Sequence, residues 1–392
     1  MTRKPRPNST RRNFLRSSFV AGGALLVGFD RISTLAAQIQ GDAFEGGKHL
    51  GNLDFAAESR APLDTLFGSE LDARLYSDLS ILTPENPIPP TERFYVRTCA
   101  SHLLDSEKAW QIRLGGLVDK NVTLSILDLK KGARPVGLHL MECSGNARAT
   151  RYGMISVADW SGTLMSDVLE LCKSKPRATR VVVSGFDSYA ATSATSLPGA
   201  DWVFTVEQLK TSRAFLATEM NGHPLSKDHG APVRLIMPGW YGCASIKWVN
   251  AITFVDENFL ATSQMQEFAA RTHQQGVPKL AKDYLPAMID QAAMPIRVEK
   301  WFVDGRIKYR VVGILWGGSR LVKALEIRFN PEENYVRVDH FSQPANDPWS
   351  FWSYAWTPRT VGTYMIRLRV ADPLVETKRL DSGYYVRSVE VT

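Results

Sequence analysis

Met141-Glu142-Cys143-Ser144-Gly145-Asn146-Ala147-Arg148 is the stretch around which this 392-residue chain is organised. An apolar run at 136–141 leads into it, so we expect a strand that delivers Cys143 into a Gly/Asn turn flanked by Arg148 and Arg151. A thiolate in such a turn is a soft, strongly donating ligand for a transition metal, and nearby cations favour its deprotonated form. The alternative is an ordinary buried thiol, the usual state of a free cysteine, and the octet alone does not choose between the two.

The first forty residues have the layout of an export signal. Six basic residues precede the first acidic one, Asp30, and they are Arg3, Lys4, Arg6, Arg11, Arg12 and Arg16. A short apolar segment at 19–29 and small residues near 35–37 follow. The segment 9–15, Ser-Thr-Arg-Arg-Asn-Phe-Leu, has the twin-arginine pattern of the bacterial route that exports folded proteins. We therefore expect residues 1–37 to be a twin-arginine signal peptide. The mature protein is then expected in the periplasm, with a cofactor bound before export. The alternative is a chance arginine pair in a disordered tail.

Composition excludes several classes of protein. With 44% hydrophobic and 22% charged residues, the chain is globular and long enough for two or three domains. No apolar run approaches the roughly 20 residues that span a bilayer, so no membrane span is expected. The formal charge of +7 comes mostly from the signal, because the 40 basic and 39 acidic residues after position 37 nearly balance. No nucleic-acid-binding surface is predicted.

The four cysteines, at 99, 143, 172 and 243, show neither a CxxC pair nor the spacing of a zinc site or disulfide framework. Cys172 lies in a helical pattern and is expected in the core. Some of the others could still pair in an oxidising compartment. An unpaired cysteine in an exported protein favours, to a small degree, a role as a ligand.

The chain up to residue 275 divides into an extended segment and a mixed domain. Residues 38–90 are polar and irregular, and they end in a Pro-rich stretch that favours extended backbone. Strands are predicted at 110–118, 136–143, 180–185, 214–220, 233–237 and 246–255. Helices are predicted at 162–173, from the spacing of Leu164, Val168 and Leu171, and after Thr205, which forms a capping-box pattern with Gln208. Regular βαβ units and nucleotide-binding glycine motifs are missing, so residues 91–275 are predicted to form a mixed α+β domain.

The last third of the chain has a different hydrophobic pattern. Residues 256–296 resemble a linker, and seven short alternating strands follow, at 297–303, 307–316, 322–329, 335–341, 350–356, 364–370 and 384–391. Such closely spaced strands with polar turns predict an immunoglobulin-like sandwich, here without the inter-sheet disulfide because this part contains no cysteine. We assign residues 276–392 to this domain and expect it to serve in dimerisation, so that the protein could be a homodimer.

In its motifs the chain resembles the sulfite oxidase family of molybdenum enzymes, over nearly all of the mature sequence. Seven pieces of the family pattern occur in order: Phe94-Tyr95-Val96-Arg97; Cys143-Ser144-Gly145-Asn146-Ala147-Arg148; Ala158-Asp159-Trp160-Ser161-Gly162; Glu219-Met220-Asn221-Gly222-His223-Pro224-Leu225 with Asp228-His229-Gly230-Ala231-Pro232-Val233-Arg234; Pro238-Gly239-Trp240-Tyr241-Gly242; Ile246-Lys247-Trp248; and Asp283-Tyr284. The resemblance implies a molybdopterin-binding domain of mixed α/β structure followed by the sandwich, an α+β fold.

The same resemblance assigns roles to seven residues. It implies molybdenum held by a pterin dithiolene, most simply in the mononucleotide-free form, with Cys143 as the metal ligand. By the resemblance His229, Arg234 and Lys247 anchor the cofactor phosphate, Arg97 and Arg148 bind the substrate anion, and Tyr284 points toward the metal. Each has an ordinary alternative when taken alone, such as a turn histidine, a surface arginine or a loop tyrosine. Trp160 is read as core with a role in the pocket left open.

Two departures from the family pattern matter. The family usually has a histidine two positions after the pocket arginine; here the residue is Cys99, which we do not take as a ligand, while a histidine stands at His102. Either His102 replaces the contact or the contact is lost. No fused cytochrome b5 segment or CxxCH haem site is found, so electrons must leave to a separate carrier.

The function implied by the resemblance is oxidation of sulfite to sulfate by oxo transfer, with electrons passed to an external c-type cytochrome. Three alternatives remain. The protein could be a sulfane dehydrogenase-like subunit of a sulfur-oxidising complex, a nitrate or sulfoxide reductase on the same scaffold, or a secreted binding protein without a cofactor.

Overall fold

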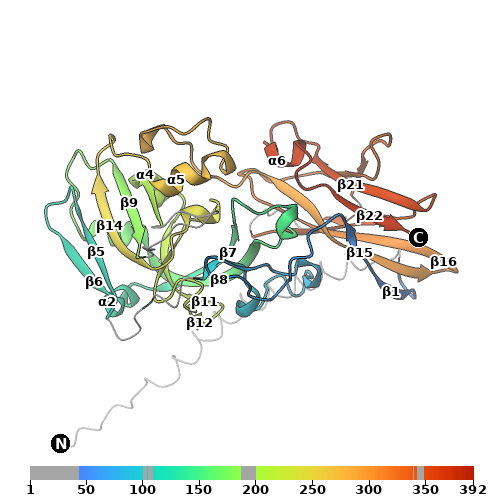
Figure 1. The fold of residues 1–392 in the computed structure, drawn as a ribbon, viewed down its shortest axis with the longest axis horizontal. Coiled ribbons are helices and arrows are strands. Elements are labelled where there is room, and N and C mark those ends of the chain that lie inside the picture. Colours follow the sequence, from blue (N-terminus) through green and yellow to red (C-terminus); the bar gives the residue numbers. More distant parts are fainter. Residues whose placement is uncertain (1–43, 100–103, 105–108, 187–199, 339, 342–347) are drawn as a thin grey trace, which may run out of the picture.

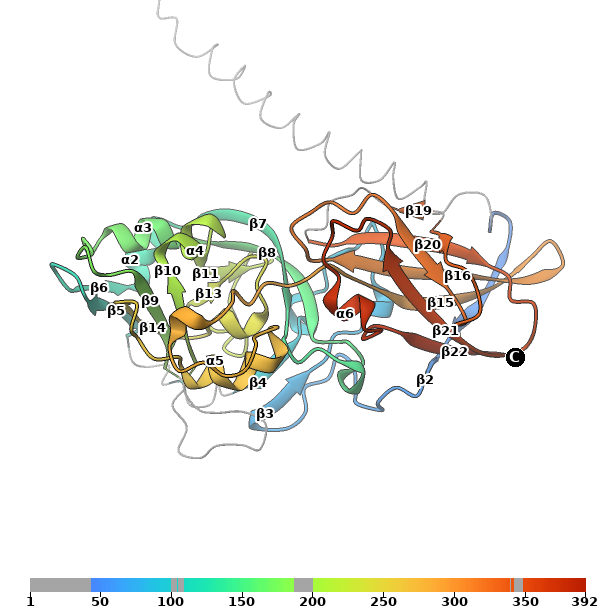
Figure 2. The ribbon, with the colours of Figure 1, turned by 90° about the horizontal axis from the view of Figure 1, so that it is seen from above.

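The computed structural model describes residues 44–99, 104, 109–186, 200–338, 340–341 and 348–392. The expected signal peptide and His102 lie outside these residues. The described chain forms two lobes that lie side by side (Figures 1 and 2). In this part of the chain, no helix combines the length and the apolar character needed to cross a membrane.

The first lobe holds two five-stranded sheets. One has the order β10-β9-β14-β5-β6, and its strands are β5 (Gln111–Gly116), β6 (Val122–Ser125), β9 (Arg180–Gly185), β10 (Asp201–Thr205) and β14 (Val249–Val255). The other has the order β12-β11-β8-β7 with β13 also paired to β11; its strands are β7 (Arg134–Glu142), β8 (Ile155–Leu164), β11 (Phe215–Met220), β12 (His223–Pro224) and β13 (Arg234–Ile236). Only the β14–β5 pair is parallel among these neighbours, which agrees with the predicted mixed sheet.

Short helices cap the strands of this lobe. They are α2 (Ile126–Lys131), α3 (Met165–Glu170), α4 (Val206–Thr211) and α5 (Ser263–Phe268). The predicted capping box is confirmed, because the Thr205 N–H donates to Gln208 Oε1 at 2.8 Å and the Gln208 N–H donates to Thr205 Oγ1 at 2.9 Å. The helix predicted at 162–173 is shorter than expected. Its first residues end β8, where a Cβ on Gly162 would stand 2.3 Å from the Leu216 carbonyl oxygen on β11, so glycine permits the close strand contact.

The second lobe is a two-sheet sandwich, as predicted. Its sheets have the orders β1-β15-β16-β20-β19 and β18-β17-β21-β22-β2. The strands are β15 (Ala292–Val303), β16 (Arg306–Trp316), β17 (Leu325–Arg328), β18 (Val336–Arg337), β19 (His340–Phe341), β20 (Ser350–Trp356), β21 (Gly362–Val370) and β22 (Arg387–Val391), and α6 (Lys378–Asp381) lies between the last two. All seven predicted strand segments contain strands, although 335–341 is divided between β18 and β19.

The segment before residue 90 is more ordered than its composition predicts. Strand β1 (Lys48–Leu53) pairs with β15 and β2 (Phe55–Ala56) pairs with β22, so the N-terminal segment adds one strand to each sheet of the sandwich. A third strand, β3 (Glu70–Leu75), pairs with β4 (Val96–Cys99) in the first lobe. These strands were missed because their hydrophobic alternation is weak; they take their order from the strands they join.

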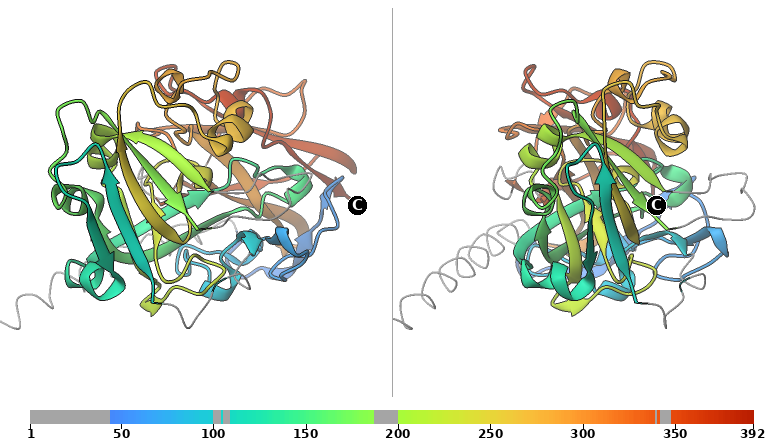
Figure 3. Two further views of the ribbon diagram at one scale, coloured as in Figure 1. Left: turned by 60° about the vertical axis from the view of Figure 1, so that its left-hand side comes forward. Right: turned by 90° about the vertical axis from the view of Figure 1, so that its left-hand side faces the viewer.

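The region at 256–296 is likewise not a simple linker. It contains α5, whose N-cap Thr262 accepts a hydrogen bond from the Met265 N–H at 3.2 Å, and it ends inside β15. The two further views place the first lobe in front of the orange and red strands of the second (Figure 3). One buried apolar cluster runs through both lobes, and a smaller one, which includes Phe94 and Trp160, surrounds Cys143. All four cysteines lie in the described residues as free thiols, and Cys172 is buried, as predicted.

Candidate active site

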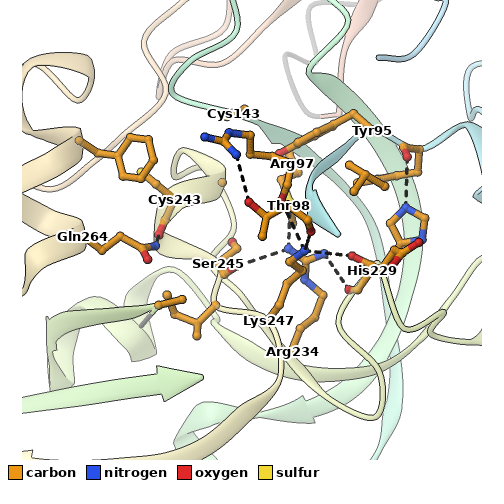
Figure 4. A pocket seen from close by; sticks show the side chains of 18 of the residues that line it. Tyr95, Arg97, Thr98, Cys143, His229, Arg234, Cys243, Ser245, Lys247 and Gln264 are labelled. Carbon is orange, nitrogen blue, oxygen red and sulfur yellow. Dashed lines mark hydrogen bonds between the residues drawn. The ribbon is translucent and has the colours of Figure 1, made fainter. Parts of the chain in front are cut away.

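A cleft in the first lobe opens beside the end of β7, and its empty space amounts to about 860 Å³ including the mouth. Five of the seven predicted site residues line it: Arg97, Cys143, His229, Arg234 and Lys247. They come from β4, the turn after β7, the loop before β13, β13 itself and the segment before β14. Figure 4 shows the ends of Arg234 and Lys247 meeting in the middle of this group, with Arg97 and Cys143 on one side and His229 on another.

Backbone hydrogen bonds hold Cys143 at the end of β7. Its N–H donates to the Met154 carbonyl at 2.9 Å, and its own carbonyl accepts from the Asn146 N–H at 2.9 Å. The Asn146 side chain closes the turn by accepting from the Met154 N–H at 3.1 Å. Burial raises the pKa of the Cys143 thiol, whereas the Gly145 N–H, Arg97 and Arg271 act in the opposite direction. A metal ion would replace the proton, as thiolate ligation requires.

Directly before Cys143, the carboxylate of Glu142 is fully buried. Trp316 Nε1 donates to its Oε2 at 2.8 Å, Tyr385 Oη donates to its Oε1 at 3.0 Å, and Asn146 Nδ2 donates to the same oxygen at 3.2 Å. Arg379 Nη1 lies 4.0 Å from Oε1. Trp316, Tyr385 and Arg379 belong to the second lobe. The sandwich therefore helps to hold the strand that carries Cys143, which the sequence did not predict.

The floor of the cleft carries a buried cation. Arg234 is 5% exposed; its Nη1 donates to the His229 carbonyl at 2.9 Å and its Nη2 to the Ser245 carbonyl at 3.3 Å. Its Nε is buried without a hydrogen-bond partner, and no carboxylate pairs with the guanidinium within the described residues. Burial lowers the pKa of Arg234 to about 10. A buried guanidinium of this kind is stabilised by an anion that desolvates with it, so the site fits the phosphate of a pterin cofactor.

His229 and Lys247 complete this floor. The Phe94 carbonyl can only accept, so His229 Nε2 carries the proton and donates to it at 3.1 Å, while Nδ1 accepts from Ser226 Oγ at 2.8 Å. Lys247 Nζ donates to the carbonyls of Asp228 at 3.1 Å, Arg97 at 3.4 Å and Thr98. Both side chains are thus oriented before any ligand binds.

The neutral state of His229 predicts a pH-dependent stability for the cofactor-free protein. Burial, with Arg234 and Lys247 nearby, lowers the pKa of His229 from 6.5 to about 4. The folded state therefore takes up this proton less readily than the unfolded chain. Above pH 6.5 His229 is neutral in both states and costs no stability. As the pH falls from 6.5 toward 4, only the unfolded chain takes up the proton, and the free energy of unfolding decreases by up to about 3 kcal/mol.

We expect His229→Gln to flatten this part of the pH profile, because glutamine has no proton to gain. Urea unfolding of both proteins at several pH values between 7.5 and 4 measures the difference. If the wild-type protein and the variant lose stability in parallel over that range, His229 is not the group responsible.

Arg97 forms the cationic wall next to the thiol. Its Nη1 donates to Thr98 Oγ1 at 3.1 Å, and the residue lies opposite Arg74 in the β3–β4 ladder. Burial lowers the pKa of Arg97 and the charge of Arg74 lowers it further, while Cys143 and Glu267 act in the opposite direction. Arg74 Nη2 lies 3.6 Å from Asp72 Oδ1, so Arg97 is the arginine of this pair that faces the thiol and suits an anion in the cleft.

Two predicted site residues lie elsewhere. Arg148 is exposed, is not among the described residues that line the cleft, and its Nη2 donates to the Val386 carbonyl at 2.6 Å. The 3-10 turn Arg148–Thr150 directs this side chain toward the second lobe. Tyr284 also does not line the cleft; it packs against the large apolar cluster, and its buried hydroxyl has no partner among the described residues. The structure therefore does not bring Tyr284 to the cleft, and its role beside a metal stays a prediction.

Trp160 is core, and the Arg234 guanidinium lies 5.8 Å from its ring centre. Cys99 donates to Asp228 Oδ1 at 2.8 Å and is not among the described residues that line the cleft.

Sequence reasoning missed several residues at the site. Tyr95 and Cys243 line the cleft, and Arg271 lies close to the Cys143 turn. Tyr95 could have been found, because it stands two positions before Arg97, the spacing at which side chains of an extended chain share one side. Burial raises the pKa of the Cys243 thiol to about 12, so it is a protonated neighbour of the site. No local pattern marks Arg271.

The comparisons with known proteins agree with this geometry. The family described as oxidoreductase molybdopterin binding domain matches residues 100–263. Mitochondrial sulfite oxidase of Drosophila melanogaster is 27% identical over 331 residues, which cover 78% of this chain and 56% of that protein. Nitrate reductase [NADPH] of Fusarium oxysporum is 25% identical over 328 residues, which cover 70% of this chain and 35% of that protein.

A solved structure has the same fold. The sulfane dehydrogenase SoxCD of Paracoccus pantotrophus superimposes with a TM-score of 0.63 at 19% identity, covering 90% of this chain and 96% of the matched one. The chain spans 56% or less of the length of the two curated relatives above. Residues 100–263 thus match a molybdopterin-binding oxidoreductase domain, and the chain is similar to the sulfite oxidase family of molybdopterin-dependent oxidoreductases in its motifs, its curated relatives and the arrangement of its cleft.

Proposed function

We propose that this protein is a periplasmic molybdenum oxidoreductase that oxidises sulfite to sulfate and passes the electrons to an external c-type cytochrome. The observation that carries the proposal is the pairing of a buried thiol, Cys143, with a cationic floor that lacks a counter-ion at Arg234. A molybdenum–pterin cofactor satisfies both at once, with Cys143 as the metal ligand and Arg234, His229 and Lys247 around the phosphate. Its mononucleotide-free form needs one phosphate site and is the simplest assignment.

The reaction is a two-electron oxidation. Sulfite gains one oxygen atom, which comes from water, and two electrons and two protons are released. The bound cofactor supplies the redox chemistry, and the protein supplies binding and orientation. Arg97 neutralises the incoming anion beside Cys143 and offsets part of the cost of removing it from water. The buried Tyr95, on the same wall, excludes water from the region next to the thiol.

Export and partners are part of the same proposal. The twin-arginine pattern at 9–15 supports a periplasmic location, where c-type cytochromes can accept electrons one at a time. The sandwich lobe supports a homodimer by analogy with domains of its type, and the partner cytochrome would be a separate chain.

A single assay tests this function. Full-length protein, produced in a molybdenum-competent bacterial host and recovered from the periplasmic fraction, should contain about one molybdenum per chain, because one thiol ligand holds one metal. It should reduce ferric cytochrome c when sulfite is added, with sulfate as product. Absence of molybdenum would overturn the cofactor assignment. Turnover of nitrate or a sulfoxide with a reduced donor, without turnover of sulfite, would move the protein to the reductase class.

A second candidate is a sulfane dehydrogenase subunit. The match to SoxCD, which covers 90% of this chain and 96% of the matched one, supports it. Its substrate would be a sulfane sulfur bound to a carrier protein. Turnover that requires a persulfidated carrier protein, with free sulfite inactive, would select this candidate.

A further inference from the structure

We propose that Arg271 is a second anion-binding arginine of the site, taking the role that the sequence pattern assigns to Arg148, and that Arg379 of the second lobe positions it. The inference rests on the proposed function, since it concerns the anion that reacts next to Cys143. Arg271 follows α5, in a short turn that runs past the Cys143 loop. No comparison and no motif assigns it a role.

The first argument is distance to the thiol turn. A Cβ built on Gly145 would lie 3.2 Å from Arg271 Nη1 and 3.9 Å from Cys143 Sγ. The guanidinium and the sulfur thus lie near the same point, and their separation cannot exceed the sum of these two distances. Glycine at position 145 leaves this point free, where a Cβ would crowd the guanidinium.

The second argument is that the guanidinium of Arg271 is exposed and held in place. It lies over the ring of Phe268, a residue that lines the cleft, with its central carbon 5.5 Å from the ring centre. No salt bridge involves Arg271 within the described residues. Its N–H groups can therefore bind an oxyanion with the planar, two-pronged geometry that suits sulfite or sulfate. Arg148 lacks this freedom, because its guanidinium is bound to the Val386 carbonyl.

The third argument is the link through Arg379. One nitrogen of this buried side chain, Nη2, donates to the carbonyl of Arg271 at 2.7 Å and to the carbonyl of Ser144 at 3.1 Å. The rings of Tyr241 and Tyr384 lie 4.6 Å and 5.0 Å from its central carbon. Arg379 thus ties the backbone that carries Arg271 to the backbone next to Cys143. The second lobe thereby sets the spacing between the anion-binding group and the thiol.

The test uses the cofactor-free, full-length chain and the chemistry of Cys143 itself. Alkylation of Cys143 by iodoacetate, an anion, and by iodoacetamide, which is neutral, is followed by mass spectrometry of the peptide. Both reagents react with the thiolate. A change in the pKa or the exposure of Cys143 therefore affects both rates alike and cancels in the ratio of the iodoacetate rate to the iodoacetamide rate. A cation beside the sulfur raises this ratio. We expect Arg271→Gln to lower the ratio about fivefold and Arg271→Lys to lower it less.

The matched control is Arg359→Gln, which removes an exposed arginine of the second lobe and should leave the ratio at the wild-type value. Arg379→Lys should lower the ratio although Arg271 is still present, because the lysine side chain is shorter and its ammonium does not reach the place of Nη2 between the two carbonyls. The same ratio measured in urea-unfolded protein should be equal in all variants, and the midpoint of thermal unfolding of each variant shows whether its chain stays folded during the reaction. An unchanged ratio in Arg271→Gln overturns the assignment of Arg271, and an unchanged ratio in Arg379→Lys overturns the positioning role.

The loaded enzyme provides the second readout. Arg271→Gln should raise KM for sulfite about tenfold, the loss of one charge-assisted hydrogen bond, with a smaller change in kcat. A lower alkylation ratio with an unchanged KM would show that Arg271 does not bind the substrate. If the wild-type enzyme does not oxidise sulfite, the proposed function fails, whereas the alkylation ratio still decides whether Arg271 forms an anion site at Cys143.

Discussion

Cys143→Ser should lower kcat of the molybdenum-loaded protein by at least about a thousandfold, because a serine hydroxyl stays protonated and is a harder, weaker donor than a thiolate. Serine is close to cysteine in size, and the backbone bonds from Cys143 to Met154 and Asn146 do not involve the side chain. The fold should therefore survive. Turnover, molybdenum content and the midpoint of thermal unfolding, measured on the same preparations, separate loss of ligation from loss of structure.

Cys172→Ser is the control for this experiment. Cys172 is fully buried in the large apolar cluster, away from the cleft, so a serine there should cost about 1–3 kcal/mol of stability. It should leave turnover and molybdenum content per folded chain unchanged. Should Cys143→Ser retain both full turnover and the metal, Cys143 is not the ligand and the central assignment is wrong.

Arg379→Met should produce the largest loss of stability among single substitutions at the lobe interface, about 3–5 kcal/mol. The change leaves Glu142 buried without its cationic partner and removes the donor to the carbonyls of Ser144 and Arg271. Burial raises the pKa of Glu142, and Arg379 is the strongest influence that opposes this rise. Urea unfolding of the cofactor-free chain measures the loss, and it should be smaller in Glu142→Gln, which removes the buried charge and keeps one acceptor oxygen for Tyr385 and Asn146.

The double variant Glu142→Gln with Arg379→Met tests whether the two residues act as a pair. Its loss should be smaller than the two single losses combined, by about 1–3 kcal/mol. Arg369→Met is the matched control: Arg369 Nε lies 2.5 Å from Glu326 Oε2, but its side chain is half exposed to water, so its loss should be at most about 1 kcal/mol. Equal losses in Arg379→Met and Arg369→Met would show that the buried network does not hold the lobes together.

Local patterns in the sequence determined much of this protein. The alternation that predicted the sandwich strands and the Thr205–Gln208 cap depend on residues close together in the chain, and the structure has both. The placement of Cys143 at the end of a strand follows from the apolar run before it. The cationic floor of Arg234, His229 and Lys247 was predicted from the family motifs, and the structure brings the three together in the cleft.

Only the tertiary structure decided which further side chains reach Cys143. Glu142 meets Trp316 and Tyr385, which lie 174 and 243 positions away in the chain, and Arg379 reaches Ser144 across 235 positions. Such contacts depend on how the sandwich docks against the first lobe, which no periodicity within a strand or helix records. The direction of a single turn after Asn146 likewise sends Arg148 to the second lobe. The sequence therefore determined the secondary-structure elements and the candidate ligand Cys143, and the packing of the two lobes decided which charged side chains surround it.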